Sequence, residues 1–262
     1  MNYNEIRFEV RKNVAYVTLD RPAALNAVNL EVNEELARAA LECQYDRRIR
    51  SVLFRATGEH FCAGGDLERF AQEGDRVSEY VTKAADAFHL AISRFTRLDA
   101  PVVGAVQGLA IGGGMSIVAM LDIPIAGEGA RFMCGYTRIG LTPDGALTYF
   151  LPRLVGRRRA LDLILTNRTL NAREALEIGL IARVVPDTNL QTEAEECANA
   201  LAEGPTRSFG AAKRLLLQSS VESLDTQMAY EGRELALAVA RPDGKEGAKT
   251  FKERRRSRFS GE

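Results

Sequence analysis

An aspartate in a turn-forming tetrapeptide is the first candidate for chemistry. The segment GLTPDGALTYF, residues 140–150, contains Thr142-Pro143-Asp144-Gly145, and Asp144 is its only carboxylate. Proline presets φ and glycine accepts a positive φ, so these residues predict a turn. In that local interpretation Asp144 is a turn residue or a helix N-cap. The alternative is a catalytic carboxylate, because a carboxyl group in an apolar stretch is suited to proton transfer.

Two glycine-rich segments offer a second kind of chemistry. Gly112-Gly113-Gly114 follows a predicted buried strand and opens an apolar helix, and the loop HFCAGGDL (60–67) also follows a strand. Backbone N–H groups in such places lack intrahelical partners and carry the positive end of a helix dipole. Two of them from separate loops would form an oxyanion hole. The alternative role of these glycines is close packing of a helix on a sheet.

Composition excludes several other classes of function. Lys+Arg and Asp+Glu both number 35, which argues against binding to nucleic acid or to a membrane surface. A hydrophobic content of 46% and a charged content of 27% are typical of a soluble globular protein. The four cysteines form no CxxC pair and there are only two histidines, so we predict free thiols and no metal site. No GxGxxG or P-loop motif is found at the glycine-rich turns.

Alternating strands and helices must position these residues. A hairpin is predicted at 5–10 and 14–19. Further strands are expected at 51–56, 101–108 and 122–127, and helices at 29–45, 78–97 and 111–121. This order indicates an α/β core with parallel strands. Helices then dominate, at 157–165, 172–179, 190–202, 205–218, 221–239 and 243–256. We therefore expect a core over 1–195 and a helical C-terminal region over 196–262.

The N-terminus is polar and no apolar span appears, so a cytoplasmic protein is predicted.

Four segments together resemble the enoyl-CoA hydratase/isomerase, or crotonase, superfamily. They are RPAALNAV (21–28), HFCAGGDL (60–67), PVVGAVQGLAIGGGMSIVAMLDIPIA (101–126) and ARFMCGYTRIGLTPDG (130–145), and the similarity extends over roughly residues 5 to 260. The resemblance implies an α/β fold in the form of a crotonase-like spiral of repeated ββα units, with a helical C-terminal trimerisation region. It also implies a homotrimer or a dimer of trimers.

The resemblance also implies the substrate and the site. Substrates would be acyl-CoA thioesters, with coenzyme A as part of the substrate and no permanently bound cofactor. The N–H groups of Gly65 and Gly113 would polarise the thioester carbonyl so that an enolate forms. The CoA-binding residues implied by the motifs are Arg21, Ala23, Ala24, Leu25, Ala63, Gly65, Asp66 and Leu67.

The chain departs from the hydratase pattern at two positions. Hydratases of the family use two glutamates around one water, and these positions hold Ser116 and Tyr136 here. An acid/base pair contributes about 10²–10⁴-fold per group, and serine and tyrosine do not readily replace it. Asp144 instead matches the working aspartate of the isomerase and 4-chlorobenzoyl-CoA dehalogenase branches.

Three interpretations follow from that match. The favoured one is an enoyl-CoA isomerase with Asp144 as proton shuttle. Tyr136 would orient Asp144, orient a substrate carbonyl, or only line the pocket. The second is dehalogenase-like hydrolysis, with Asp144 as nucleophile and His89 as base. Gly65 stands where the dehalogenase has a bulky aromatic residue, which favours the isomerase. The third is a catalytically silent acyl-CoA-binding subunit.

Overall fold

A computed structural model describes residues 3–262, and its centre is a six-stranded sheet. The strand order is β1 (Ile6–Arg11), β2 (Val14–Leu19), β3 (Ser51–Ala56), β4 (Val102–Val106), β6 (Ile123–Gly127) and β9 (Arg183–Val185). Only β1 and β2 pair antiparallel, and every later pairing in this sheet is parallel. A second sheet contains β5 (Leu109–Ile111), β7 (Arg131–Met133) and β8 (Leu170–Asn171). The expected hairpin and parallel α/β core are therefore confirmed.

Local sequence signals account for the first elements. Lys12 and Asn13 both have positive φ, as a two-residue hairpin turn requires. Helix α1 (Leu30–Tyr45) begins where the Asn29 side chain accepts a hydrogen bond from the N–H of Val32. Sequence and structure agree here because each signal is local.

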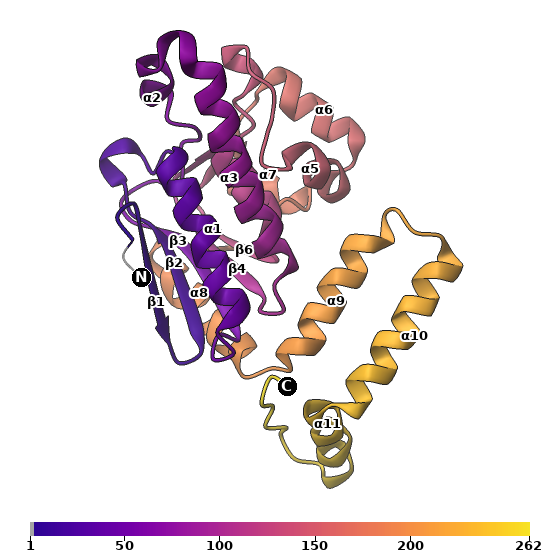
Figure 1. Ribbon diagram of the computed structural model, residues 1–262. Coiled ribbons are helices and arrows are strands. Elements are labelled where there is room, and N and C mark those ends of the chain that lie inside the picture. Colours follow the sequence, from indigo (N-terminus) through magenta and orange to yellow (C-terminus); the bar gives the residue numbers. More distant parts are fainter. Residues whose placement is uncertain (1–2) are drawn as a thin grey trace.

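Helices cover both faces of the large sheet (Figure 1). On one face α1 and α3 (Val77–Arg97) run side by side, joined by a hydrogen bond from Asn33 Nδ2 to the Ala84 carbonyl (3.0 Å). On the other face α8 (Leu190–Ala202) packs its buried alanines against β2, β3 and β4. The boundary expected at 195/196 falls inside α8, and the division into two regions stays a prediction.

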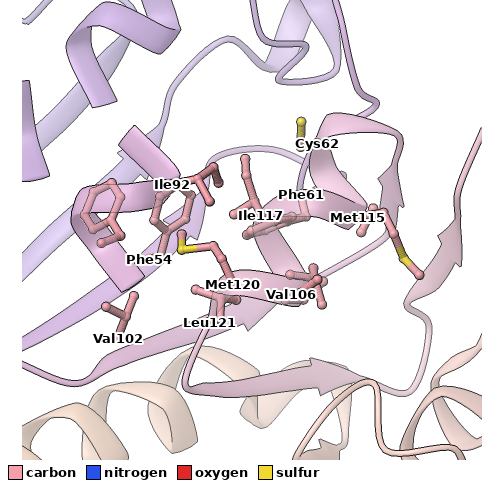
Figure 2. Close-up of a cluster of buried hydrophobic side chains, with 14 of the residues drawn as sticks. Phe54, Phe61, Cys62, Ile92, Val102, Val106, Met115, Ile117, Met120 and Leu121 are labelled. Carbon is pink, nitrogen blue, oxygen red and sulfur yellow. The ribbon is translucent and has the colours of Figure 1, made fainter. Parts of the chain in front are cut away.

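Helix α4 (Gly113–Met120) passes through the core, and every one of its residues is buried. Figure 2 shows Met115, Ile117 and Met120 from this helix among Phe54, Phe61 and neighbouring aliphatic side chains. The helix predicted at 111–121 begins two residues late, because Ile111 belongs to β5. The glycine-rich segment is thus the first turn of a helix that is buried on all sides.

The C-terminal helices α10 (Leu224–Ala240) and α11 (Pro242–Glu253) stand away from the α/β core (Figure 1). Helix α9 (Thr206–Ser219) contacts the core through ion pairs from Lys213 to Asp122 and from Arg214 to Asp99. Helix α10 has no buried residue. Its exposed apolar side chains include Leu224, Met228, Leu235 and Val239. Helix α11 ends earlier than expected because Arg254 adopts a left-handed φ of 55°.

The remaining helices connect these parts. Helices α6 (Arg157–Thr166) and α7 (Ala172–Glu177) lie close to their expected ranges. Two helices were not predicted, α2 (Leu67–Gln72) and α5 (Leu147–Val155). The part of the chain that the structure describes contains no helix long and apolar enough to span a membrane.

Candidate active site

The three consecutive glycines at the start of α4 have three different roles. Gly112 has a φ of 53°, which favours glycine. A Cβ on Gly114 would lie 2.3 Å from the carbonyl oxygen of Cys62, so this residue permits close packing. Gly113 is the residue between them, and its N–H has no hydrogen-bond acceptor within residues 3–262. Gly114 therefore serves close packing, whereas Gly113 has the free N–H that the predicted oxyanion hole needs, and its role there stays a prediction.

Gly65 lies in the loop that faces the start of α4. The loop is fixed by a bridge between Val28 and Gly65, and by a hydrogen bond from the N–H of Val28 to the Gly64 carbonyl (2.8 Å). A Cβ on Gly64 would lie 3.6 Å from the nitrogen of Gly113, so the two loops touch. The N–H of Gly65 likewise finds no acceptor in the described chain. Two free backbone donors thus occur on neighbouring loops, as an oxyanion hole requires.

Gly65 and Gly113 line one cavity of about 500 Å³, and Asp144 lines it too. Most of the remaining wall is apolar, with Phe70 and Phe88 as its phenylalanines. The ring of Phe70, on α2, lies 3.3 Å from where a Cβ on Gly65 would be. An aromatic ring therefore stands beside the free N–H even though residue 65 is glycine. The missing aromatic side chain at Gly65 is consequently a weaker argument against a ring-shaped acyl group than the sequence suggested.

The backbone around Asp144 forms the turn that the sequence predicts. Gly145 has a φ of 58°, and a Cβ there would lie 2.4 Å from the Phe88 ring. Ala146 is also left-handed, with a φ of 59°. The expected N-cap role is not observed, because the N–H of Leu147 bonds to the main-chain carbonyl of Asp144 and no side chain caps α5. The Asp144 carboxylate is therefore available for other contacts.

Tyr136 binds that carboxylate. Its hydroxyl donates to Asp144 Oδ1 at 2.6 Å, a short distance typical of a bond to an ionised acceptor. Burial, followed by the charge of Asp144, raises the pKa of the Tyr136 phenol. The phenol therefore stays protonated and remains a donor. Tyr136 thus contacts Asp144 and lines the cavity, and its role in orienting Asp144 or a substrate carbonyl stays a prediction.

His89 lies apart from this cavity. It is exposed on α3 and lines a second cavity of about 520 Å³, together with Ser93, Thr96 and the other side of Asp144. Asp144 thus lines both cavities. The catalytic role of His89 stays a prediction, as does that of every other site residue.

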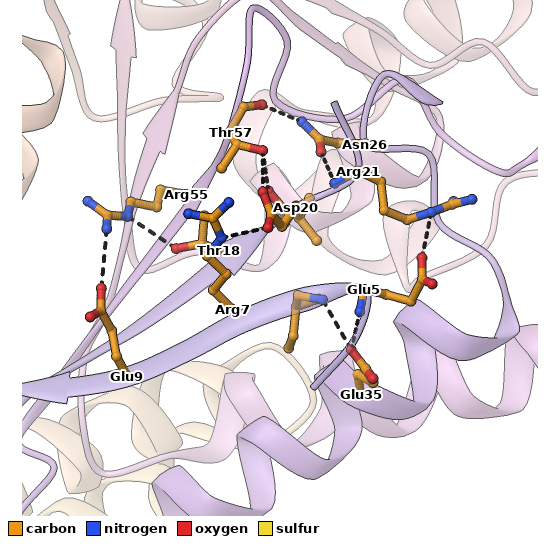
Figure 3. Close-up of polar contacts among 12 residues, drawn as sticks. Glu5, Arg7, Glu9, Thr18, Asp20, Arg21, Asn26, Glu35, Arg55 and Thr57 are labelled. Carbon is orange, nitrogen blue, oxygen red and sulfur yellow. Dashed lines mark hydrogen bonds and ion pairs between the residues drawn. The ribbon is translucent and has the colours of Figure 1, made fainter. Parts of the chain in front are cut away.

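The residues expected to bind CoA cluster around the loop of Gly65. Arg21 forms ion pairs with Glu5 (2.6 Å; Figure 3) and Asp66 (3.1 Å), and it donates to the Ala27 carbonyl. Its guanidinium therefore joins the loop of residues 21–28 to the loop of residues 60–67.

The other expected CoA-binding residues lie in the same two loops, and only some of them line the cavity. Ala23 and Ala24 lie in a 3₁₀ turn (Pro22–Ala24), followed by exposed Leu25. Ala63 and Leu67 line the cavity, and Asp66 caps α2.

Other chemistry has little support at the site. Burial raises the pKa of the Cys62 thiol to about 12, so this cysteine packs rather than reacts. Residues 3–262 contain no group of three or more His, Cys, Asp or Glu that could hold a metal ion. Sequence reasoning missed Phe70 and Asn33 in the cavity wall, because neither lies in a motif.

Comparison with known proteins agrees with this geometry. A family model described as enoyl-CoA hydratase/isomerase matches residues 9–262. A probable enoyl-CoA hydratase of Rhodobacter capsulatus is 34% identical over 100% of both chains. The 1,2-epoxyphenylacetyl-CoA isomerase of Escherichia coli is 34% identical over 96% of this chain and 97% of its own. The crystal structure of an enoyl-CoA hydratase from Bacillus anthracis superposes with a TM-score of 0.92 at 30% identity, covering 99% and 100% of the two chains. The α/β spiral fold inferred from the sequence is confirmed.

Proposed function

The chain belongs to the enoyl-CoA hydratase/isomerase family, and we propose that it is an enoyl-CoA isomerase in which Asp144 carries the proton. One observation carries the proposal. Within the described residues, Asp144 is the only carboxylate in the cavity that also contains Gly65 and Gly113. The substrate is an acyl-CoA thioester whose double bond or strained ring lies within reach of that carboxylate.

The reaction follows from these groups. The thioester oxygen accepts hydrogen bonds from the N–H groups of Gly65 and Gly113, and each donor contributes about 3–4 kcal/mol to the stability of an oxyanion. Asp144 removes a proton from carbon, which leaves an enolate held by the two donors. The same carboxyl group then returns the proton to another carbon of the conjugated system. No water is added, and no net charge is left on the enzyme.

Ser116 and Tyr136 support isomerisation over hydration. Neither residue is a carboxylate, and their hydroxyl groups already lie 3.0 Å from each other. Activating and delivering a water needs two acid/base groups, and this cavity offers one. Coenzyme A enters as part of the substrate, and we propose that no cofactor is permanently bound.

The second cavity supports a second candidate. His89 and Asp144 both line it, so the cavity brings together the two residues that this reaction needs. In dehalogenase-like hydrolysis Asp144 attacks the halogen-bearing ring carbon, halide leaves, and His89 activates the water that cleaves the aryl ester. Phe70 gives the first cavity an aromatic wall for such a ring.

A panel of CoA esters in ¹⁸O water separates these candidates. The panel contains trans-3-hexenoyl-, crotonyl-, 1,2-epoxyphenylacetyl- and 4-chlorobenzoyl-CoA. A shifted double bond or opened ring without label supports the isomerase, whereas labelled 4-hydroxybenzoyl-CoA over many turnovers supports hydrolysis. Labelled 3-hydroxybutyryl-CoA contradicts the proposal. Tight binding without any turnover supports the third candidate, an acyl-CoA-binding subunit.

Asp144→Asn tests the role of the carboxylate. We expect kcat for the active ester to fall about 10²–10⁴-fold, the usual contribution of a general base. Asp86→Asn is the matched control, because Asp86 is exposed on α3 and lines neither cavity. An Asp144→Asn enzyme with the activity of the parent would refute the mechanism.

Self-association belongs to the same proposal. Helix α10 exposes an apolar face, and α9 adds Leu216 at 74% exposure. We propose that this face assembles a homotrimer or a dimer of trimers, and that the enzyme is cytoplasmic. Light scattering during size-exclusion chromatography tests the assembly, and a monomer of 28.8 kDa would contradict it.

A further inference from the structure

The Ser116 hydroxyl lies within hydrogen-bond distance of both the Tyr136 hydroxyl and the main chain of Asp144. The residue lies in the first turn of α4 and is 0% exposed. Its hydroxyl oxygen is 3.0 Å from the Tyr136 hydroxyl, 3.0 Å from the Asp144 main-chain carbonyl and 3.3 Å from the Gly112 carbonyl. One buried hydroxyl therefore joins the helix of the oxyanion hole to the turn of the carboxylate.

The direction of the hydrogen bonds can be assigned from the donors available. The single proton of the Tyr136 phenol goes to Asp144 Oδ1, because an ionised oxygen is the strongest acceptor nearby. The phenol oxygen then accepts from Ser116 or leaves Ser116 to donate to the Asp144 carbonyl. Ser116 supports Asp144 through the phenol in the first arrangement and through the main chain in the second, and the third acceptor, the Gly112 carbonyl, is more distant at 3.3 Å.

Close packing makes this contact possible. A Cβ on Gly145 would lie 2.8 Å from Ser116 Cβ, so the turn lies directly against α4. Within residues 3–262, Asp144 Oδ1 accepts the Tyr136 hydrogen bond and Oδ2 accepts none. The two oxygens of the carboxylate are therefore not equivalent.

We propose that Ser116 is a positioning residue that fixes Asp144 so that Oδ2, and not Oδ1, exchanges the proton with the substrate. This inference rests on the proposed function, and it gives the serine at the lost glutamate position a task of its own. Ser116 itself touches neither the substrate nor the reacting atoms.

Ser116→Ala tests the inference, with Ser51→Ala as the matched control. Ser51 is also 0% exposed and its hydroxyl donates to the Ala198 carbonyl (2.7 Å), but it lines neither cavity. Both variants lose one buried hydroxyl. Amide hydrogen exchange is measured on the peptide covering 142–147 in the full chain. We expect exchange there to accelerate about 10-fold in Ser116→Ala, the factor that one hydrogen bond of ordinary strength gives, and not in Ser51→Ala.

Kinetics supply the second measurement. With trans-3-hexenoyl-CoA as substrate, Ser116→Ala should lower kcat about 10-fold and leave KM unchanged, because binding by the backbone donors remains. Unchanged exchange in Ser116→Ala, equal acceleration in Ser51→Ala, or accelerated exchange with parental kcat would each overturn the inference. If the parent enzyme isomerises no ester, the proposed function is wrong. The exchange measurement needs no turnover, so it still tests the contact between Ser116 and the Asp144 turn.

Discussion

The hydrogen bond from Tyr136 to Asp144 makes a specific kinetic prediction. Tyr136→Phe removes the hydroxyl that lies 2.6 Å from Asp144 Oδ1 and leaves the ring in place. A hydrogen bond to a charged group contributes about 1.5–3 kcal/mol. At about 1.36 kcal/mol per factor of ten, kcat for isomerisation should fall about 10- to 150-fold.

The pH dependence of this loss follows from the phenol. Burial and the charge of Asp144 raise the pKa of Tyr136, so the proton that is donated is present throughout the neutral range. The ratio of parental to variant kcat should therefore be constant between about pH 6 and pH 9, well below the ordinary tyrosine pKa of about 10. A ratio that falls toward one as the pH approaches 9 would show that Tyr136 loses its proton in this range, which would contradict the assignment.

Tyr149→Phe is the matched control. Its hydroxyl donates to the neutral carbonyl of Leu217 at 3.3 Å, and it lines the second cavity instead of the first. We expect isomerisation at the parental rate in this variant, measured as the absorbance of the conjugated enoyl thioester. If Tyr136→Phe also retains the parental kcat, isomerisation does not depend on the orientation of the Asp144 carboxylate, and the reasoning is wrong.

Two further predictions concern stability. Gly114→Ala should cost about 1–3 kcal/mol by overpacking and lower both Tm and kcat, because its Cβ would lie 2.3 Å from the Cys62 carbonyl; calorimetry and the isomerase assay check this, and a parental Tm would contradict it. The bonds from Arg255 hold the pKa of Glu246 at about 2, below its usual 4.5. A depressed carboxyl pKa gives stability that is present above pH 4.5 and lost as the pH falls toward 2. The Tm difference between the parent and Glu246→Gln should therefore shrink over that interval, and a constant difference would contradict the assignment.

Sequence reasoning located the elements whose signals are local. The hairpin, helix α1 and the turn at Gly145 each have signals in nearby residues, and each is observed. Helix α2 was missed because its six residues are too few to show a periodic pattern. Strand β5 was missed because its three residues are too few to show an alternating pattern, and Ile111 was assigned to the helix that follows.

Contacts between distant segments could not be predicted in the same way. That Phe70 lies against Gly65, or that Ser116 meets the Asp144 turn, depends on how α2 and α4 pack, which no local signal encodes. The match of Gly65, Gly113 and Asp144 to family motifs did predict that they share a cavity. The separation of His89 into another cavity was not predicted, since its position on α3 gave no indication of which side of Asp144 it would face.

The free donors at Gly65 and Gly113 belong to the main chain, and this has an evolutionary consequence. A single base change in the gene replaces a side chain but leaves every peptide N–H except that of a new proline. In the proposed mechanism, the two groups that stabilise the enolate are thus not removed by replacing their own side chains. The hydroxyl and carboxyl groups of residues 116, 136 and 144 are removed by such a change, and they lie beside these donors. A lineage with the proposed mechanism can therefore exchange one reaction for another by changing a few side chains, while the donors that polarise the thioester are inherited.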